Sequence, residues 1–127
     1  MLFRSRNTAS VSVTEAVLRV SCGADNYVPV AKVTNLANAL RLAKQAGFTI
    51  IGAVVKDGQP LDEIEFPFPL GIVIGSEQKG VREIIRRQLD GQLTIPMAGG
   101  ALTLNVSHAA TIIGYEVTRQ KKNKKSF

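Results

Sequence analysis

Two short stretches of the sequence are apolar without interruption, and they constrain the fold more than any other feature. Residues 48–55 read FTIIGAVV, and residues 70–74 read LGIVI. A strand with one face in water alternates apolar and polar side chains, whereas a strand buried on both faces is apolar throughout. The two stretches therefore predict strands of a parallel sheet that is covered on both faces.

A helical pattern precedes the first of these strands. The predicted helix begins at Thr34 or Asn35, either of which can cap it, and ends at Gly47. Its inward face consists of Leu36, Ala39, Leu40 and Ala43. Residues 56–69 contain acidic residues and three of the five prolines, and are predicted to be a long surface connection between the two strands.

The last third of the chain continues the alternation of helices and strands. Residues 81–89 are predicted to be helical, with Ile84 and Ile85 pointing inward. A third strand is predicted over residues 93–95, and Pro96 closes it because proline has no backbone N–H. The alternation predicts an α/β fold with a mostly parallel sheet.

The final predicted helix carries two partly apolar stripes. It begins near Asn105 or Ser107, either of which can cap a helix. One stripe consists of Val106, Ala109, Ala110, Ile113 and Val117. The second consists of His108, Ile112, Tyr115 and Arg119. A helix with two such stripes needs cover on more than one side, which a second subunit can supply.

Length and composition predict one domain, which we interpret as cytoplasmic. Its predicted limits are residues 1–120, before the basic C-terminal run. The 127 residues, 45% of them hydrophobic, fit a single globular core. No apolar run approaches the roughly 20 residues of a membrane span, and the N-terminus MLFRSRNTAS lacks the apolar core of a secretory signal. A lone cysteine, Cys22, cannot form an internal disulfide, and no His or Cys spacing predicts a metal site.

The chain is strongly basic. Its net charge of +6 suits a polyanionic partner without identifying one. Part of the excess lies in RQKKNKK, residues 119–125, and residues 121–127 are predicted to be a basic, solvated tail. Such a tail attracts phosphates in a salt-dependent way.

Two glycine-bearing loops follow predicted strands, at the edge where α/β sheets bind ligands. The first is GSEQKG, residues 75–80, whose glycines have the spacing of a P-loop. Val81 and Arg82 stand where that motif needs Lys and Ser or Thr, so it is not a P-loop. The second loop, residues 97–105, contains two adjacent glycines. By position alone these loops are either a small-molecule site or plain turns.

Three polar residues at these loops also have simple structural roles open to them. Glu77 can stabilise the N-terminus of the following helix through its dipole, and Asn105 can be only an N-cap. His108 has no Ser or Cys partner in a catalytic pattern, so a structural or solvent role is favoured.

Both loop segments resemble signature motifs of a known family. LGIVIGSEQKGV at residues 70–81 and LTIPMAGGALTLNVSHAATIIGYEVTRQ at residues 93–120 resemble the second and third motifs of the TrmH (SpoU) branch of the SPOUT RNA methyltransferases. Residues 17–40 are similar to the preceding segment of the RlmB-type bacterial enzymes, which methylate a ribose 2′-hydroxyl of large-subunit ribosomal RNA. The resemblance runs from about residue 7 to residue 121.

The resemblance implies a SPOUT-like α/β fold with helices on both faces of the sheet and a C-terminal trefoil knot. It further implies that S-adenosylmethionine binds to the knot loops and that the protein is a homodimer through its final helix. The matching positions for cofactor contact, largely through backbone groups, are Gly75, Ile95 and Leu104, with Met97 alongside.

The same resemblance implies the catalytic residues. Glu77, Thr103 and Asn105 match positions that shape the catalytic centre, with Thr103 in place of the family's usual Ser. The family's first motif, which supplies an Asn and an activating Arg, has no match, and neither Arg4 nor Arg6 lies in a matching context. The chain is therefore expected to be an N-terminally truncated form of the domain.

The predicted function is transfer of a methyl group from S-adenosylmethionine to a ribose 2′-hydroxyl of RNA. Ribosomal RNA is the favoured substrate, and tRNA is the second candidate. The alternative is a catalytically inactive, truncated relative that acts as a dimeric module binding the cofactor or RNA. A nucleotide-binding regulator is less favoured, because both the P-loop and the G-x-G-x-x-G pattern are lacking.

Overall fold

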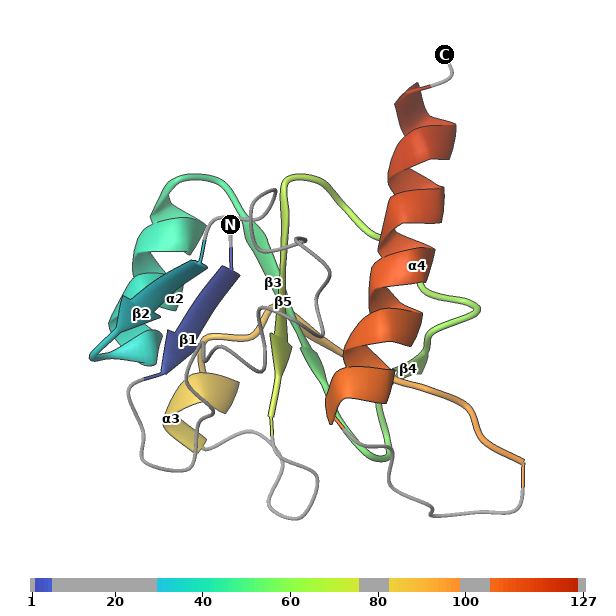
Figure 1. Ribbon diagram of the computed structural model, residues 1–127, viewed down its shortest axis with the longest axis horizontal. Helices are drawn as coiled ribbons and strands as arrows, with labels where there is room; N and C mark the ends of the chain where they lie inside the picture. The colour runs from blue at the N-terminus through green and yellow to red at the C-terminus, as the bar shows by residue number, and fades with distance from the viewer. Residues whose placement is uncertain (1, 6–29, 76–82, 99–105, 126–127) are drawn as a thin grey trace, which may run out of the picture. The chain divides into compact units, whose positions relative to one another are not determined.

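The computed structural model describes residues 2–5, 30–75, 83–98 and 106–125 (Figure 1). The chain divides into two compact units, residues 1–39 and 40–127. In the described part of the first unit, β1 (Leu2–Ser5) pairs in parallel with β2 (Val30–Val33), and Leu2 lies opposite Val30.

A four-stranded parallel sheet forms the second unit. It contains β3 (Thr49–Ala53), β4 (Gln59–Pro60), β5 (Leu70–Ile74) and β6 (Gly91–Thr94). The order is β4-β6-β3-β5, and every pairing is parallel. The two uninterrupted apolar runs are the neighbouring strands β3 and β5, which lie side by side in Figure 1. The predicted α/β fold with a mostly parallel sheet is confirmed. The knot stays a prediction, because residues 76–82 and 99–105 lie outside the described part of the chain.

The helix before β3 begins and ends as predicted. Helix α2 spans Leu36–Gln45, and the N–H of Asn38 donates to Asn35 Oδ1 at 3.0 Å, so Asn35 is the N-cap. Gly47 has a φ of 98°, a left-handed conformation that glycine adopts without strain, and it ends the helix. Local sequence chemistry is sufficient to set both ends.

The helix after β5 is shorter than predicted. Helix α3 spans only Glu83–Arg86. Ile85 is 7% exposed, but Ile84 is 60% exposed, so the prediction that both side chains point inward is wrong. Successive residues of a helix are about 100° apart, and a single turn with one covered side buries only one of two neighbours.

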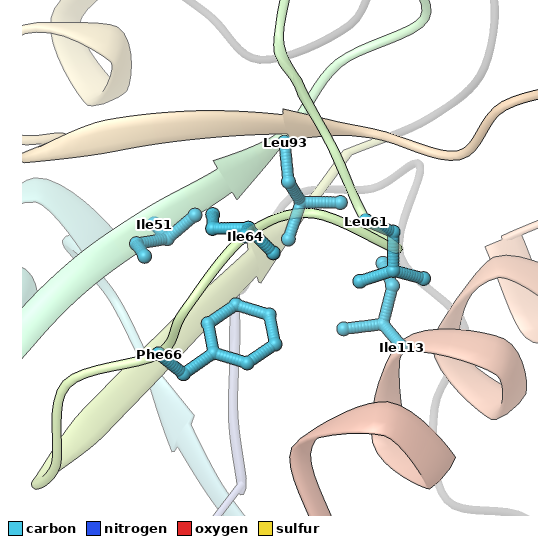
Figure 2. Close-up of a cluster of buried hydrophobic side chains, with 6 residues drawn as sticks. All are labelled: Ile51, Leu61, Ile64, Phe66, Leu93 and Ile113. Atoms are coloured by element: carbon cyan, nitrogen blue, oxygen red, sulfur yellow. The ribbon is translucent and has the colours of Figure 1, made fainter. Parts of the chain in front are cut away.

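Residues 56–69 are not the surface connection that the prolines predicted. They contain β4, which pairs with β6, and three side chains of the main core. That core cluster consists of Ile51, Leu61, Ile64, Phe66, Leu93 and Ile113 (Figure 2). The acidic residues between these core side chains are exposed, so buried and exposed side chains alternate along the segment. The prolines interrupt regular secondary structure, which is why the sequence shows no strand or helix pattern there.

Helix α4 (Val106–Lys125) covers this core with one face only. Ile113 is 2% exposed, and Val117 packs against the same cluster. Ala110, predicted on the inward face, is exposed instead. The whole second stripe, His108, Ile112, Tyr115 and Arg119, is also exposed. Of the helices in the described ranges, none is both long and apolar enough to cross a bilayer.

The C-terminal half of α4 is held by side-chain contacts to the backbone of Ile64 and Phe66 and to the ring of Phe68. Gln120 Nε2 donates to the carbonyl of Ile64, and the N–H of Phe66 donates to Gln120 Oε1, both at 2.8 Å. Lys124 Nζ donates to the carbonyl of Phe66 and lies 5.0 Å from the centroid of the Phe68 ring. Residues 121–125, which the sequence placed in a basic tail, thus belong to an anchored helix. The domain limit at residue 120 stays a prediction.

Glu116, one turn before Gln120, predicts a pH dependence of stability. Hydrogen bonds from the Arg119 guanidinium lower the pKa of the Glu116 carboxyl below its usual 4.5, although partial burial opposes the shift. A pKa that is lower in the folded state stabilises the protein above the unfolded value, and the effect is lost as the pH falls through the folded value. The wild type should therefore be slightly more stable than Glu116→Gln at about pH 7, and the difference should shrink as the pH falls below 4.5. Thermal unfolding of both proteins across this range checks the prediction, and a gap that widens toward acid pH would contradict it.

Candidate functional site

The carboxyl ends of three strands meet at one edge of the sheet. Ala53 of β3 pairs with Ile74 of β5 on one side and with Leu93 of β6 on the other. The next residues along the three strands, Val54, Gly75 and Thr94, therefore emerge at the same end. We call residues 54, 75 and 94–97 the carboxyl edge. Edges of this kind are where open α/β sheets bind ligands.

The structure brings together those predicted cofactor-binding residues that it describes. Gly75 directly follows β5, and Ile95 and Met97 follow β6 on the other side of β3. All three are half-buried, and Ile95 packs against the core cluster. With neighbouring strands about 4.8 Å apart, the ends of β5 and β6 lie roughly 10 Å from each other. This spacing suits a small molecule that touches both strand ends.

The remaining predicted site residues lie outside the described part of the chain. They are Glu77, Thr103, Leu104 and Asn105. Their roles stay predictions. His108, which follows them at the start of α4, is exposed.

The sequence-based interpretation missed a third component of this edge, residues 54–58. This loop connects β3 with β4 and contains Asp57, whose φ is 69°. Its N–H at Val54 donates to the carbonyl of Leu93 at 2.8 Å, and its N–H at Gly58 donates to Thr94 Oγ1 at 2.9 Å. The Asp57–Gly58 dipeptide soon after the apolar run at residues 48–55 is a sequence signal for a tight turn at this position.

Backbone groups dominate the chemistry of the described edge. No polar or charged side chain is buried within the described ranges, and those ranges hold no group of three or more His, Cys, Asp or Glu suited to a metal ion. At this edge the described residues place the backbone of Gly75 beside the half-buried side chains of Ile95 and Met97. Such a surface suits an organic ligand that is held by backbone hydrogen bonds and apolar contact.

Comparison with known proteins places most of the chain within one group. The model of the SpoU rRNA Methylase family matches residues 2–115. A protein of Staphylococcus saprophyticus named as a TrmH family tRNA/rRNA methyltransferase is 39% identical over 112 residues, which cover 88% of this chain and 45% of that protein. An uncharacterized tRNA/rRNA methyltransferase of Mycolicibacterium smegmatis is 40% identical over 114 residues, covering 90% and 36%. The chain thus spans about a third to a half of the length of these relatives.

Solved structures show the same fold. The TrmH/SpoU tRNA modifying enzyme of A. aeolicus superposes with a TM-score of 0.80 at 30% identity, covering 98% of this chain and 64% of that one. The SpoU methyltransferase AviRb of Streptomyces viridochromogenes, in complex with the cofactor AdoMet, superposes with a TM-score of 0.80 at 27% identity. The matched region covers 96% of this chain and 50% of AviRb.

Proposed function

This chain belongs to the SpoU rRNA methylase family, and we propose that it transfers a methyl group from S-adenosylmethionine to a ribose 2′-hydroxyl of RNA. One observation carries the proposal. Three parallel strands end together, and Gly75 on one side and Ile95 and Met97 on the other are left half-buried at the same edge. This edge binds the cofactor.

The neighbouring structures support both the cofactor and the reaction. AviRb was crystallised with AdoMet, and a structure described as an RNA 2′-O ribose methyltransferase matches with a TM-score of 0.72 at 28% identity, covering 83% of this chain and 40% of that one. The backbone groups and apolar side chains of the carboxyl edge fit a ligand with an adenine ring and an aliphatic chain that contains sulfur. The trefoil knot is part of the same proposal, with the loops after β5 and β6 as its cofactor-binding segments.

The chemistry of methyl transfer determines the role that we propose for each site residue. Bound S-adenosylmethionine supplies a methyl group on a positively charged sulfur. Gly75, Ile95, Met97 and Leu104 hold and orient the cofactor. Glu77, Thr103 and Asn105 shape the centre in which the ribose hydroxyl is aligned for in-line attack. Removal of the hydroxyl proton is the task of the family's first motif, for which this sequence has no match.

Ribosomal RNA is the proposed substrate, and tRNA is the second candidate. The family description names rRNA, and the relatives are named for both RNA classes. The net charge of +6 supports a polyanionic substrate of either kind. We place the reaction in the cytoplasm, where both RNA classes are available.

Two measurements on the chain test this function. Calorimetric titration with S-adenosylhomocysteine should give saturable binding with one site per chain. Incubation with methyl-labelled S-adenosylmethionine and ribosomal RNA should give a labelled product whose methylated position resists alkaline hydrolysis, as a 2′-O-methyl does. Failure of a folded chain to bind S-adenosylhomocysteine would contradict the function. Binding without transfer to ribosomal RNA or tRNA would support the non-catalytic module instead.

We further propose that the protein is a homodimer through α4. The stripe formed by His108, Ile112, Tyr115 and Arg119 lies on this helix away from the core, with Ile112 40% and Tyr115 74% exposed. A second copy would remove both apolar side chains from water.

Replacing one residue of this stripe should separate the dimer. In Ile112→Glu, a charge enters the centre of the proposed interface, and we expect the dimer dissociation constant to rise about 100-fold or more. Ala110→Glu is the matched control, because residue 110 is also exposed on α4 but lies about 200° away around the helix. Sedimentation velocity over a range of concentrations measures both. A wild-type monomer, or an Ile112→Glu dimer of unchanged affinity, would rule out this interface.

A further inference from the structure

We propose that Thr94 is a positioning residue for cofactor binding: its hydroxyl fixes the 54–58 loop at the carboxyl edge, so that the loop forms a rigid wall of the cofactor site. The inference rests on the proposed function, since it concerns the same edge. Neither Thr94 nor this loop is among the site residues that the family resemblance implies.

The hydroxyl of Thr94 acts as both a hydrogen-bond donor and a hydrogen-bond acceptor to this loop. It donates to the carbonyl of Val54 at 3.1 Å and accepts the N–H of Gly58 at 2.9 Å. Val54 opens the loop and Gly58 closes it, so a single side chain ties the two ends together. Because a strand position accepts valine as readily as threonine, the strand itself does not require this hydroxyl.

Backbone contacts on either side leave the loop little freedom to move. The N–H of Val54 donates to the carbonyl of Leu93 at 2.8 Å, and the N–H of Leu61 donates to the carbonyl of Thr94 at 2.9 Å. A Cβ atom at Gly58 would lie 2.6 Å from the carbonyl carbon of Leu93 and 2.7 Å from Thr94 Oγ1. Only glycine fits such a close approach, so the end of the loop lies directly on β6.

The position of the loop connects it with the cofactor. Val54 continues β3, the strand between β5 and β6, so the loop begins between Gly75 and Thr94. Ile95, a predicted cofactor contact, is the next residue after Thr94. A hydroxyl that holds the carbonyl of Val54 and the amide of Gly58 therefore sets the shape of the surface between the two predicted binding segments. Binding sites depend on such supporting bonds for placement to within about 0.5 Å.

Two substitutions separate the hydroxyl from the shape of the side chain. Thr94→Val keeps the shape and removes both hydrogen bonds, and we expect the dissociation constant for S-adenosylhomocysteine to rise about tenfold or more. Thr94→Ser keeps the hydroxyl, and we expect a change of no more than about twofold. Calorimetry measures the dissociation constant, and hydrogen exchange of the Gly58 amide, expected to accelerate only in Thr94→Val, reports the loop itself.

Asp90 provides the control for a general loss of stability. It precedes β6 at the opposite end of the same strand, where its Oδ2 accepts the N–H of Ile50 at 2.8 Å and Lys44 Nζ lies 3.4 Å from its Oδ1. Asp90→Ala also removes a side-chain bond between β6 and β3, but away from the carboxyl edge. We expect a lower unfolding temperature and a dissociation constant within about twofold of the wild type.

The outcomes distinguish this inference from the proposed function. If the folded wild type does not bind S-adenosylhomocysteine, the proposed function fails, and the inference fails with it. If the wild type binds and Thr94→Val binds equally well, only the inference is overturned. It is also overturned if Thr94→Ser loses as much affinity as Thr94→Val, or if Asp90→Ala does.

Discussion

Phe66→Ala is expected to lower the free energy of unfolding by about 3–5 kcal/mol, the usual cost of removing a fully buried aromatic ring. Phe66 is 0% exposed and is the largest completely buried side chain in the described core. It lies in the cluster that joins the sheet, the 61–66 segment and α4 (Figure 2). The cavity left by the ring would be lined from all three, so collapse of one element alone cannot fill it.

Chemical denaturation of the wild type and the variant measures this loss, provided that the free energy of unfolding depends on denaturant concentration with the same slope in both proteins. Glu65→Ala is the control, because the neighbouring Glu65 is exposed, and its removal should change the stability by no more than about 0.5 kcal/mol. A loss below about 1 kcal/mol for Phe66→Ala would mean that residues 61–66 are not part of the core. The experiment thus tests the position of a segment for which the sequence-based prediction was wrong.

The parts of the fold that could be predicted are those in which the residue types of a short segment match the burial and conformation of that segment in the structure. The runs at residues 48–55 and 70–74 are apolar because β3 and β5 pair in parallel, and every residue within these two strands is buried or half-buried. Asn35 and Gly47 set the ends of α2 through a side-chain acceptor and a left-handed φ, both of which depend only on adjacent residues.

The parts that could not be predicted depend on partners far away in sequence. Residues 56–69 have the composition of a loop, but Leu61, Ile64 and Phe66 are buried because α4 packs on them. Gln120 binds the backbone of this segment from 54 and 56 residues away. Turn-forming residues show where the chain bends but not what covers the apolar side chains between the bends.

The same distinction holds for the candidate site. The meeting of Gly75 and Ile95 at one edge could be predicted, because strand polarity in a parallel sheet places the carboxyl ends of β5 and β6 together. The role of Thr94 could not, since its hydroxyl bonds to residues 36 and 40 positions away. Only the register of β3 against β6 brings Val54 and Thr94 together.

Gly75→Trp is expected to abolish cofactor binding, with a dissociation constant for S-adenosylhomocysteine raised about 100-fold or more. Gly75 is the first residue after β5 and is half-buried at the carboxyl edge. An indole at this position would occupy the space beside Val54 that the proposed cofactor needs. It would also hold the ligand away from the backbone groups that glycine leaves accessible. Calorimetric titration measures the change, and circular dichroism verifies that the variant is folded.

Gly114→Trp is the matched control for this substitution. Gly114 is exposed on α4, and a Cβ atom there would meet no atom within 4 Å. The same large side chain at this distant glycine should leave the dissociation constant within about twofold of the wild type, because it touches neither β3, β5 nor β6. Unchanged binding by Gly75→Trp would exclude the carboxyl edge as the cofactor site even if the chain binds S-adenosylhomocysteine. Loss of binding in Gly75→Trp alone would place the ligand at the end of β5, next to the loop that Thr94 holds.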